Sequence, residues 1–370
     1  MINSMIDYQK IIIDYNSSLS ETRAALANEF VSPATQGKRY LFGRNETSQQ
    51  VSQIIEIDGF IDDYAELGTT WQEKPVLSTQ NVPNNAFIVN CVLCVRPRTA
   101  ENRIKDFGFS KIIPYADLCQ TLPEAFPLPS FVLETRRDLE QNIAKWNKLY
   151  ERLSDDRSKS VLSDLLKFRL TANYQYLIDY QFRIWEQYFE PFMYRHSDEV
   201  FVDCGGFDGD TTEEFCKRYP DYKKVFLFEP SATNLAKARQ RLQNFRNIEM
   251  IELGVSDREG ILKFNPESGS ASCVSDSGSS QISVTTLDKS INEKVTFIKM
   301  DLEGWELKAL QGAIEHIAKD RPKLAIAVYH HPSDFWRISE FILDVRDDYD
   351  VYLRHYTEGW SETVMFFVPK

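Results

Sequence analysis

The sequence predicts an α/β protein with two units of alternating strands and helices, joined by a helical connector. Short apolar runs alternate with amphipathic stretches between residues 36 and 121 and again from residue 200 onward, a pattern typical of parallel sheets. A cluster of prolines at Pro123, Pro127 and Pro129 resists helix formation and marks a boundary between the two units. We therefore expect four parts: a helical lead-in (1–35), a small domain (36–121), a connector (122–196) and a larger domain (197–370).

Composition limits the partners that this chain can bind. A length of 370 residues predicts about two or three domains. The net charge of −12 and the pI of about 5.1 disfavour nucleic acid and anionic membrane surfaces as partners. No apolar run is long enough to span a bilayer, and the first residues lack the basic segment of a secretion signal. The six cysteines are too few for a disulfide framework, so we expect a cytoplasmic protein.

The first domain is predicted to be a small Rossmann-like α/β unit. Its expected elements, in order, are strand 39–43, helix 46–55, strand 57–63, strand 86–95, helix 97–107 and strand 111–114. It is similar at the level of fold to the small domain that precedes the catalytic domain in some sugar-modifying bacterial enzymes. Arg44, after the first strand, could meet an anionic ligand such as a sugar nucleotide, but a packing or dimerisation module that allows a homo-oligomer is the favoured interpretation.

Two features of this half have mainly structural interpretations. Cys91 and Cys94 form a C-x-x-C inside an apolar run, where strand alternation would direct the thiols to opposite faces, so core packing is expected. Residues 135–190 are expected to form long amphipathic helices, and residues 174–189 are rich in aromatic side chains. An aromatic stripe at helical spacing is most often core. The alternative is that this stripe covers a sugar pocket.

The larger domain is organised around residues 200–215. A short apolar run predicts a buried parallel strand, Gly205 and Gly206 predict a tight turn, and Asp210 with Glu213 has the spacing of a capping box at a helix start. Strand, glycine turn and helix start form the usual mouth of a nucleotide-type pocket at the carboxyl end of an open sheet. The glycines matter because a side chain would keep a ligand away from the backbone.

The charge of this stretch favours a cationic ligand. Asp203 ends the strand, and Asp208 and Asp210 follow closely, so a diphosphate would be repelled. S-adenosylmethionine, which has a sulfonium and an ammonium group but no phosphate, fits better. Glu229 ends the next apolar strand, where an acidic residue accepts hydrogen bonds from ribose hydroxyls. The structural alternative is that Asp203 only caps the next helix and that Glu229 is a solvated strand end.

The remaining elements complete a predicted seven-stranded mixed sheet of five parallel strands and a terminal antiparallel pair. After Glu229 we expect, in order, helix 231–243, strand 248–253, a hairpin of 261–264 with 281–286, strand 295–301, helix 305–317, strand 323–329, helix 333–346 and the pair 351–354 with 364–368. Ser256 and Asp257 follow the strand that would meet an adenine ring. The Ser/Gly-rich stretch 266–280 is interpreted as a loop that could act as a lid.

Six sequence blocks resemble the FkbM family of S-adenosylmethionine-dependent methyltransferases over roughly residues 174–368. They are VFVDCGGFDGDTTEEF, FLFEPS, LGVSDREG, TLDKS, FIKMDLEGWELKALQGA and AIAVYHHPSDFW. The resemblance implies a class I methyltransferase fold and O-methylation, commonly of sugar or natural-product hydroxyls. The Ser/Gly-rich stretch matches no part of the family pattern.

The resemblance also implies a set of cofactor-binding residues. Residues at the glycine turn would line the methionine side, Glu229 would hold the ribose, Ser256 and Asp257 would flank adenine, and Asp301 would lie beside the reacting methyl group. The complete expected set is Asp203, Gly205, Gly206, Phe207, Asp208, Glu229, Ser256, Asp257 and Asp301.

The expected catalytic residues are His330, Asp301 and Glu303. Methyl transfer to oxygen is an in-line displacement, and a sugar hydroxyl benefits from a general base. His330 ends a strand next to the one ending at Asp301, and a near-neutral pKa would let it take the proton while Asp301 orients the substrate or the base. The alternative for His330 is a helix cap; acidic residues such as Glu303 and Glu306 also complement a helix dipole. A carboxylate trio could bind a hard cation, but without a second ligand cluster we expect no metal.

Two functions from different classes follow. The first is an S-adenosylmethionine-dependent O-methyltransferase for a hydroxyl of a sugar, glycoconjugate or polysaccharide precursor. The second is a non-catalytic glycan- or nucleotide-binding protein that keeps the fold. A nicotinamide-dependent enzyme is disfavoured by the acidic turn.

Overall fold

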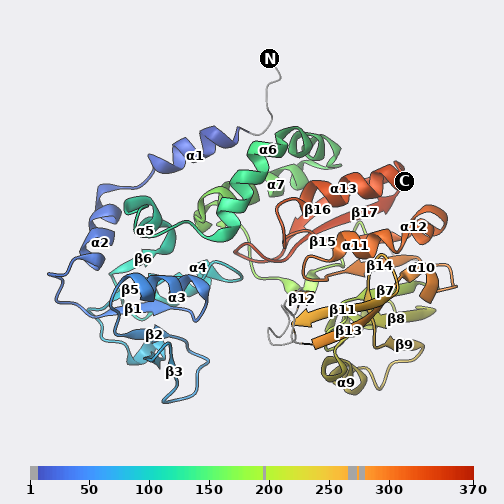
Figure 1. Ribbon diagram of the computed structural model, residues 1–370, viewed down its shortest axis with the longest axis horizontal. Coiled ribbons are helices and arrows are strands. Elements are labelled where there is room, and N and C mark those ends of the chain that lie inside the picture. Colours follow the sequence, from blue (N-terminus) through green and yellow to red (C-terminus); the bar gives the residue numbers. More distant parts are fainter. Residues whose placement is uncertain (1–6, 195–196, 266–272, 275–279) are drawn as a thin grey trace. The chain divides into compact units, whose positions relative to one another are not determined.

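The computed structural model describes residues 7–194, 197–265, 273–274 and 280–370, which fold into two compact units (Figure 1). Of these residues, unit 1 contains 7–143, 162–182 and 356–361, and unit 2 contains the others. The unit boundaries cross two long helices, α6 (Ser130–Arg152) and α7 (Asp156–Thr171), and α6 is kinked at Asn142. The predicted division into four domains stays a prediction.

Unit 1 is built on a six-stranded sheet with the order β3-β4-β2-β1-β5-β6. All neighbouring strands are parallel except β3 and β4, which form an antiparallel pair. The strands are β1 (Arg39–Phe42), β2 (Gly59–Ile61), β3 (Thr70–Trp71), β4 (Lys74–Leu77), β5 (Phe87–Asn90) and β6 (Ile112–Pro114). Strands β3 and β4 were not predicted, because β3 has only two residues and β4 contains a proline and a lysine and shows no apolar run.

Helices flank this sheet and bury its apolar side chains. They are α1 (Tyr8–Asn16), α2 (Glu21–Val31), α3 (Glu46–Ile54), α4 (Pro97–Asp106) and α5 (Tyr115–Thr121), with short 3-10 helices η1 (Thr79–Asn81) and η2 (Tyr174–Leu177). Tyr40, Ile88 and Ile104 belong to one buried cluster. The strand predicted through Cys94 ends at Asn90, so the alternation expected for the two thiols was wrong. Cys91 is buried, and Cys94 is half-buried.

The aromatic stretch 174–189 is not a helix, contrary to the prediction. Ala172 adopts a left-handed conformation (φ 57°) directly after α7, and only η2 and η3 (Ile184–Glu186) follow. The aromatic side chains therefore do not share one helical face. Tyr174 instead donates its hydroxyl to Glu101 in unit 1, and Tyr188 donates to Asp301 in unit 2.

Unit 2 is built on a seven-stranded mixed sheet with the order β16-β17-β15-β14-β7-β8-β9, shown from yellow-green to red in Figure 1. Five neighbouring strands are parallel, namely β7 (Val200–Cys204), β8 (Lys224–Phe228), β9 (Ile248–Ile251), β14 (Phe297–Met300) and β15 (Lys323–Ala327). The antiparallel pair β16 (Tyr349–His355) and β17 (Thr363–Pro369) extends the sheet beyond β15. The α/β fold with a mixed sheet is confirmed.

The helices of unit 2 differ from the prediction in two places. They are α8 (Asp210–Arg218), α9 (Ala232–Arg241), α10 (Leu287–Ser290), α11 (Glu306–Gln311), α12 (Ile314–Asp320) and α13 (Asp334–Val345). Gly209 is the N-cap of α8 and Asp210 its first residue, so the predicted capping box was wrong. The predicted helix 305–317 is two helices. They break at Gly312, where a Cβ atom would lie 2.0 Å from the carbonyl oxygen of Ser256.

A second, four-stranded sheet contains the predicted hairpin. Its order is β10-β13-β11-β12, and its strands are β10 (Gly254–Val255), β11 (Gly260–Asn265), β12 (Cys273–Val274) and β13 (Ser280–Thr285). Strands β11 and β13 pair antiparallel as expected. Most of the Ser/Gly-rich stretch lies outside the described residues, so its role as a lid stays a prediction. No helix within the described ranges has the length and hydropathy of a membrane span.

Candidate active site at the carboxyl edge of the sheet

The glycine turn after β7 is held between the two neighbouring strands. The amides of Gly205 and Gly206 both donate to the carbonyl oxygen of Phe228, at 3.0 Å each. Gly205 has a left-handed backbone (φ 79°), and a Cβ atom there would lie 2.0 Å from the carbonyl oxygen of Asp301. Only glycine permits this approach. The turn therefore lies directly beside the residue that follows β14.

Asp203 is a buried ion-pair partner beneath the turn. Its Oδ1 lies 3.0 Å from Nζ of Lys299, and its Oδ2 accepts a hydrogen bond of 2.7 Å from the Thr212 hydroxyl. Lys299 also donates to the carbonyl oxygen of Gly205 at 2.8 Å. Burial lowers the pKa of Lys299, but the negative charges of Asp203 and Asp301 outweigh it and raise the pKa above its usual value. Asp203 thus holds Lys299 in the position from which it donates to the turn.

The other two acidic residues of the turn differ from each other. Asp208 forms an ion pair of 2.6 Å with Arg241 of α9. Asp210 accepts a hydrogen bond from the amide of Thr211, and burial raises its pKa. Two of the three carboxylates are therefore compensated by cations, so the turn does not carry three free negative charges.

Glu229, one residue beyond β8, links the turn to the next helix. Its two carboxylate oxygens accept hydrogen bonds from the amides of Phe207 (3.0 Å) and Ser231 (2.9 Å). The residue is 6% exposed, and burial raises its pKa although these hydrogen bonds oppose the shift. Each carboxylate oxygen has a second lone pair, so Glu229 keeps the capacity to accept hydrogen bonds from a ligand.

Ser256 and Asp257, after β10, meet the start of α11. The indole nitrogen of Trp305 donates to the Ser256 hydroxyl at 3.2 Å, and that hydroxyl contacts Asp257 at 3.1 Å. Lys308 forms an ion pair of 3.0 Å with Asp257, and its hydrogen bond lowers the pKa of that carboxyl. The sequence analysis did not single out Trp305 at this position.

His330 lies at the centre of a group of acidic side chains that we call the carboxylate cluster: Asp301, Glu303, Glu306 and Glu362. Nε2 of His330 lies 3.2 Å from Glu303 and 3.6 Å from Asp301, and Nδ1 lies 3.1 Å from Glu306. Asp301 and Glu303 follow β14, and Glu306 begins α11. His330 follows β15, and Glu362 precedes β17. The structure therefore brings the predicted catalytic residues His330, Asp301 and Glu303 together.

The expected near-neutral pKa of His330 was wrong. Burial lowers the pKa of this imidazole, but the charge of Glu306 and the close Glu303 and Asp301 carboxylates raise it well above its usual value. For Glu306, burial raises the pKa, and the attraction of His330 more than reverses that effect. A histidine that stays protonated at neutral pH cannot accept a proton from a substrate, so a general-base role for free His330 is disfavoured.

Tyr188, Tyr329 and Glu362 also belong to the site and were missed as site residues. Tyr188 donates to Asp301 at 2.8 Å, and the Tyr329 hydroxyl contacts the same carboxylate at 3.4 Å. Burial and the charge of Asp301 raise the pKa of Glu362 to about 7. Glu362 had no local sequence signal because it lies in the turn before β17, far along the chain from the glycine turn.

Three side chains of this site stand on left-handed backbone. Tyr188, Glu303 and Glu362 have φ angles of 73°, 53° and 63°. Such conformations cost about 1–3 kcal/mol for residues other than glycine, and they gather at functional sites. Their concentration around Asp301 is independent support for a site here.

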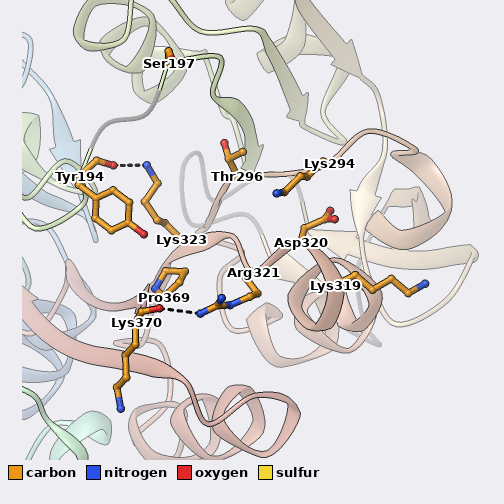
Figure 2. A pocket seen from close by; sticks show the side chains of 10 residues that line it. All are labelled: Tyr194, Ser197, Lys294, Thr296, Lys319, Asp320, Arg321, Lys323, Pro369 and Lys370. Atoms are coloured by element: carbon orange, nitrogen blue, oxygen red, sulfur yellow. Dashed lines mark hydrogen bonds between the residues drawn. The ribbon is translucent and has the colours of Figure 1, made fainter.

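A basic cavity of about 490 Å³ lies at the amino ends of the parallel strands of the same sheet, which we call the amino edge (Figure 2). Its lining residues are Tyr194, Ser197, Lys294, Thr296, Lys319, Asp320, Arg321, Lys323, Pro369 and Lys370. We call it the basic pocket. Lys323 contacts Glu199 and donates to the Tyr194 carbonyl at 2.6 Å, and Arg321 lies 2.9 Å from Asp348. None of the predicted site residues lines this pocket.

Comparisons with known proteins show that the part of the chain with the candidate site is similar to methyltransferases. Residues 203–357 match the model of the methyltransferase FkbM domain. A segment of 72 residues, 20% of the chain, is 31% identical to the 2-O-methyltransferase NoeI of Sinorhizobium fredii and spans 29% of that protein. The crystal structure of methyltransferase FkbM from Methylobacillus flagellatus superposes with a TM-score of 0.71 at 23% identity, covering 98% of this chain and 99% of that one. At this identity the likeness shows the fold.

Proposed function

Because residues 203–357 match the model of the methyltransferase FkbM domain, we propose that this protein is an S-adenosylmethionine-dependent O-methyltransferase. The acceptor would be a hydroxyl group of a sugar, glycoconjugate or polysaccharide precursor. The 31% identity to a 2-O-methyltransferase over one segment supports oxygen as the accepting atom. The observation that carries the proposal is the placement of Glu229 and the Asp301 backbone against opposite sides of one glycine turn.

The residues around the turn fit this methyl donor. Glu229 would accept hydrogen bonds from the ribose hydroxyls, since its carboxylate is fixed by two amides and retains free lone pairs. Ser256 and Asp257 would meet the adenine edge, beside Trp305. The backbone of Asp301 lies directly against Gly205, so this acidic residue is next to the turn, which suits a sulfonium and disfavours a diphosphate. Asp203 and Asp208 would support the turn through their cationic partners.

The carboxylate cluster supplies groups that act on the acceptor hydroxyl. The bound donor would provide an electrophilic methyl group. Tyr188 and Tyr329 hold the Asp301 carboxylate in place by their hydroxyls, so Asp301 would orient the acceptor hydroxyl and accept its proton. His330, protonated between Glu303 and Glu306, would position this carboxylate and stabilise its charge.

Calorimetry of S-adenosylmethionine binding tests the cofactor assignment. Glu229→Gln removes the charge from the ribose-binding acceptor, and we expect about a 10- to 100-fold loss of affinity, the value of a charged hydrogen bond. The matched control is Glu249→Gln, an exposed glutamate of β9 that forms an ion pair with Lys224. Equal affinities in the two variants would contradict the proposal.

A transfer assay tests the reaction. We expect a tritiated methyl group to pass from S-adenosylmethionine to at least one member of a panel of sugar nucleotides and oligosaccharides. Asp301→Asn should abolish transfer while the donor still binds.

A second candidate is a glycan- or nucleotide-binding protein without turnover. The carboxylates close to both ring nitrogens of His330 favour it, because they raise the pKa of the imidazole and leave no neutral ring to act as a base. Donor binding without transfer to any acceptor of the panel would support this candidate.

A further inference from the structure

Three side chains with the chemistry of metal ligands converge at the carboxyl ends of β14 and β15. Asp301, Glu306 and His330 each direct one ligand atom toward the others, and these atoms all lie within 4.8 Å of one another. The donors opposite each other around an octahedral ion lie about 4.2 Å apart, and adjacent donors about 3.0 Å, when the metal–ligand distance is about 2.1 Å. Nδ1 of His330 lies 3.1 Å from Glu306 and Nε2 lies 3.6 Å from Asp301, so either ring nitrogen has one of the two carboxylates at a distance close to the smaller of these spacings.

Buried atoms without hydrogen-bond partners give a second, independent indication. Glu306 is 1% exposed, and its Oε2 accepts no hydrogen bond from any described residue. The ring nitrogens of His330, although close to carboxylate oxygens, also lack an aligned hydrogen bond among the described residues. Leaving a buried polar group unsatisfied costs about 1–3 kcal/mol, more for a charged one. A ligand that binds these atoms would remove that cost.

The charges of the site also call for a further cation. The carboxylate cluster contributes four acidic groups, and His330 is the cation that contacts three of them. Carboxylates packed together without compensation repel one another strongly when water is excluded. A divalent ion would balance the negative charge that the imidazole and the nearby Lys299, which is also paired with Asp203, leave over.

We propose that Asp301, Glu306 and His330 form a binding site for a divalent cation of the Mn²⁺ type. Mixed carboxylate and imidazole donors suit Mn²⁺ and neighbouring transition metals better than they suit Ca²⁺. When the ion binds, the His330 imidazolium releases one proton to the solvent, so that one ring nitrogen binds the ion and the other keeps its proton and a carboxylate partner, the usual arrangement that orients a metal-binding histidine. Glu303, 3.2 Å from the ring, lies at the border of this site.

The ion would have a role in the reaction proposed above. A bound cation lowers the pKa of a hydroxyl that it contacts, so an acceptor hydroxyl at this site would lose its proton more easily. This catalytic role rests on the proposed function. The binding of the ion does not, because it depends only on the side chains named here.

Titration of the full chain with Mn²⁺ in the absence of any methyl donor tests the site directly. Electron paramagnetic resonance detects free Mn²⁺. We expect its signal to stay below that of buffer without protein until about one equivalent of Mn²⁺ has filled the site. Glu306→Gln should weaken binding by more than about 10-fold. Glu315→Gln, which changes an exposed glutamate of the nearby helix α12, should leave binding unchanged. Circular dichroism checks that the variants are folded, and Asp301→Asn replaces Glu306→Gln if that variant does not fold.

Two results would overturn the proposal. One is the absence of saturable Mn²⁺ binding by the unaltered protein. The other is unchanged binding in both Glu306→Gln and Asp301→Asn. Because no methyl donor is present, a failure of methyl transfer would count against the proposed function and leave the metal site unaffected.

Discussion

The amino edge and the carboxyl edge of the seven-stranded sheet in unit 2 carry opposite charges. They differ in how many of these charges have a partner of opposite sign within the protein. At the amino edge, the basic pocket contains five cations, and three of them have a carboxylate partner: Lys323 with Glu199, Arg321 with Asp348 and Lys319 with Glu315. At the carboxyl edge, the carboxylate cluster surrounds a single histidine.

This difference indicates which edge is built for a ligand. Charges that are paired within the protein are already compensated and offer little to a partner. Charges that remain in surplus in a half-buried place raise the free energy of the protein alone and are relieved when a cation binds. The surplus of negative charge, and not the presence of a cavity, therefore distinguishes the candidate site.

The largest effect is expected from breaking a paired charge at the amino edge. Lys323→Met removes the cation that is paired with buried Glu199, and we expect the free energy of unfolding to fall by about 3–5 kcal/mol. Urea unfolding measures this change. The matched control is Lys294→Met, which removes an exposed cation of the same pocket. Similar losses in both variants would show that pairing does not distinguish the two kinds of charge.

Removal of a surplus charge at the carboxyl edge should have the opposite effect and increase the free energy of unfolding. Burial, the charge of Asp301 and that of Glu303 raise the pKa of Glu362 to about 7, although its hydrogen bond from Gln187 and the charge of His330 oppose this shift. A carboxyl whose pKa is raised in the folded state destabilises that state as pH rises from its ordinary value toward 7. Glu362→Gln should therefore increase the free energy of unfolding at pH 8 by about 1–2 kcal/mol.

The pH dependence provides the control for this variant. In metal-free protein at pH 5, Glu362 is protonated in the folded state, and the difference between the two proteins should be small. A loss of stability at pH 8 in Glu362→Gln would show that this carboxylate is paired after all.

The smallest effect is expected in the protonation state of the His330 imidazole. In metal-free protein the raised pKa of His330 should keep both ring nitrogens protonated at pH 7.5. The stability that this charge provides is complete below pH 6.5 and is lost only as pH rises through the higher folded-state value. Nitrogen-15 NMR of the imidazole measures the protonation state. A neutral tautomer at pH 7.5 would restore His330 as a candidate general base.

Local sequence patterns were enough to predict the strand framework of both units. The runs ending at Cys204, Phe228 and Met300 are mostly apolar and bounded by turn residues, so each could be placed without knowledge of its neighbours. Because parallel strands end at one edge of a sheet, their order along the chain also brought Glu229 and Asp301 to the same place. The short strands β3 and β4, and the break at Gly312, carried no comparable signal.

The sequence by itself determined which residues reach the carboxyl edge of the sheet, and the tertiary structure decided what each of them does there. The acids of the glycine turn are compensated by Lys299 and Arg241, which are distant in sequence, whereas Asp301, Glu303 and Glu306 converge on His330. Tyr188 and Glu362 join them from segments far apart along the chain. The balance of charge depends on distances of a few ångströms between such segments, and Coulomb energies in a half-buried site change by kilocalories over that range.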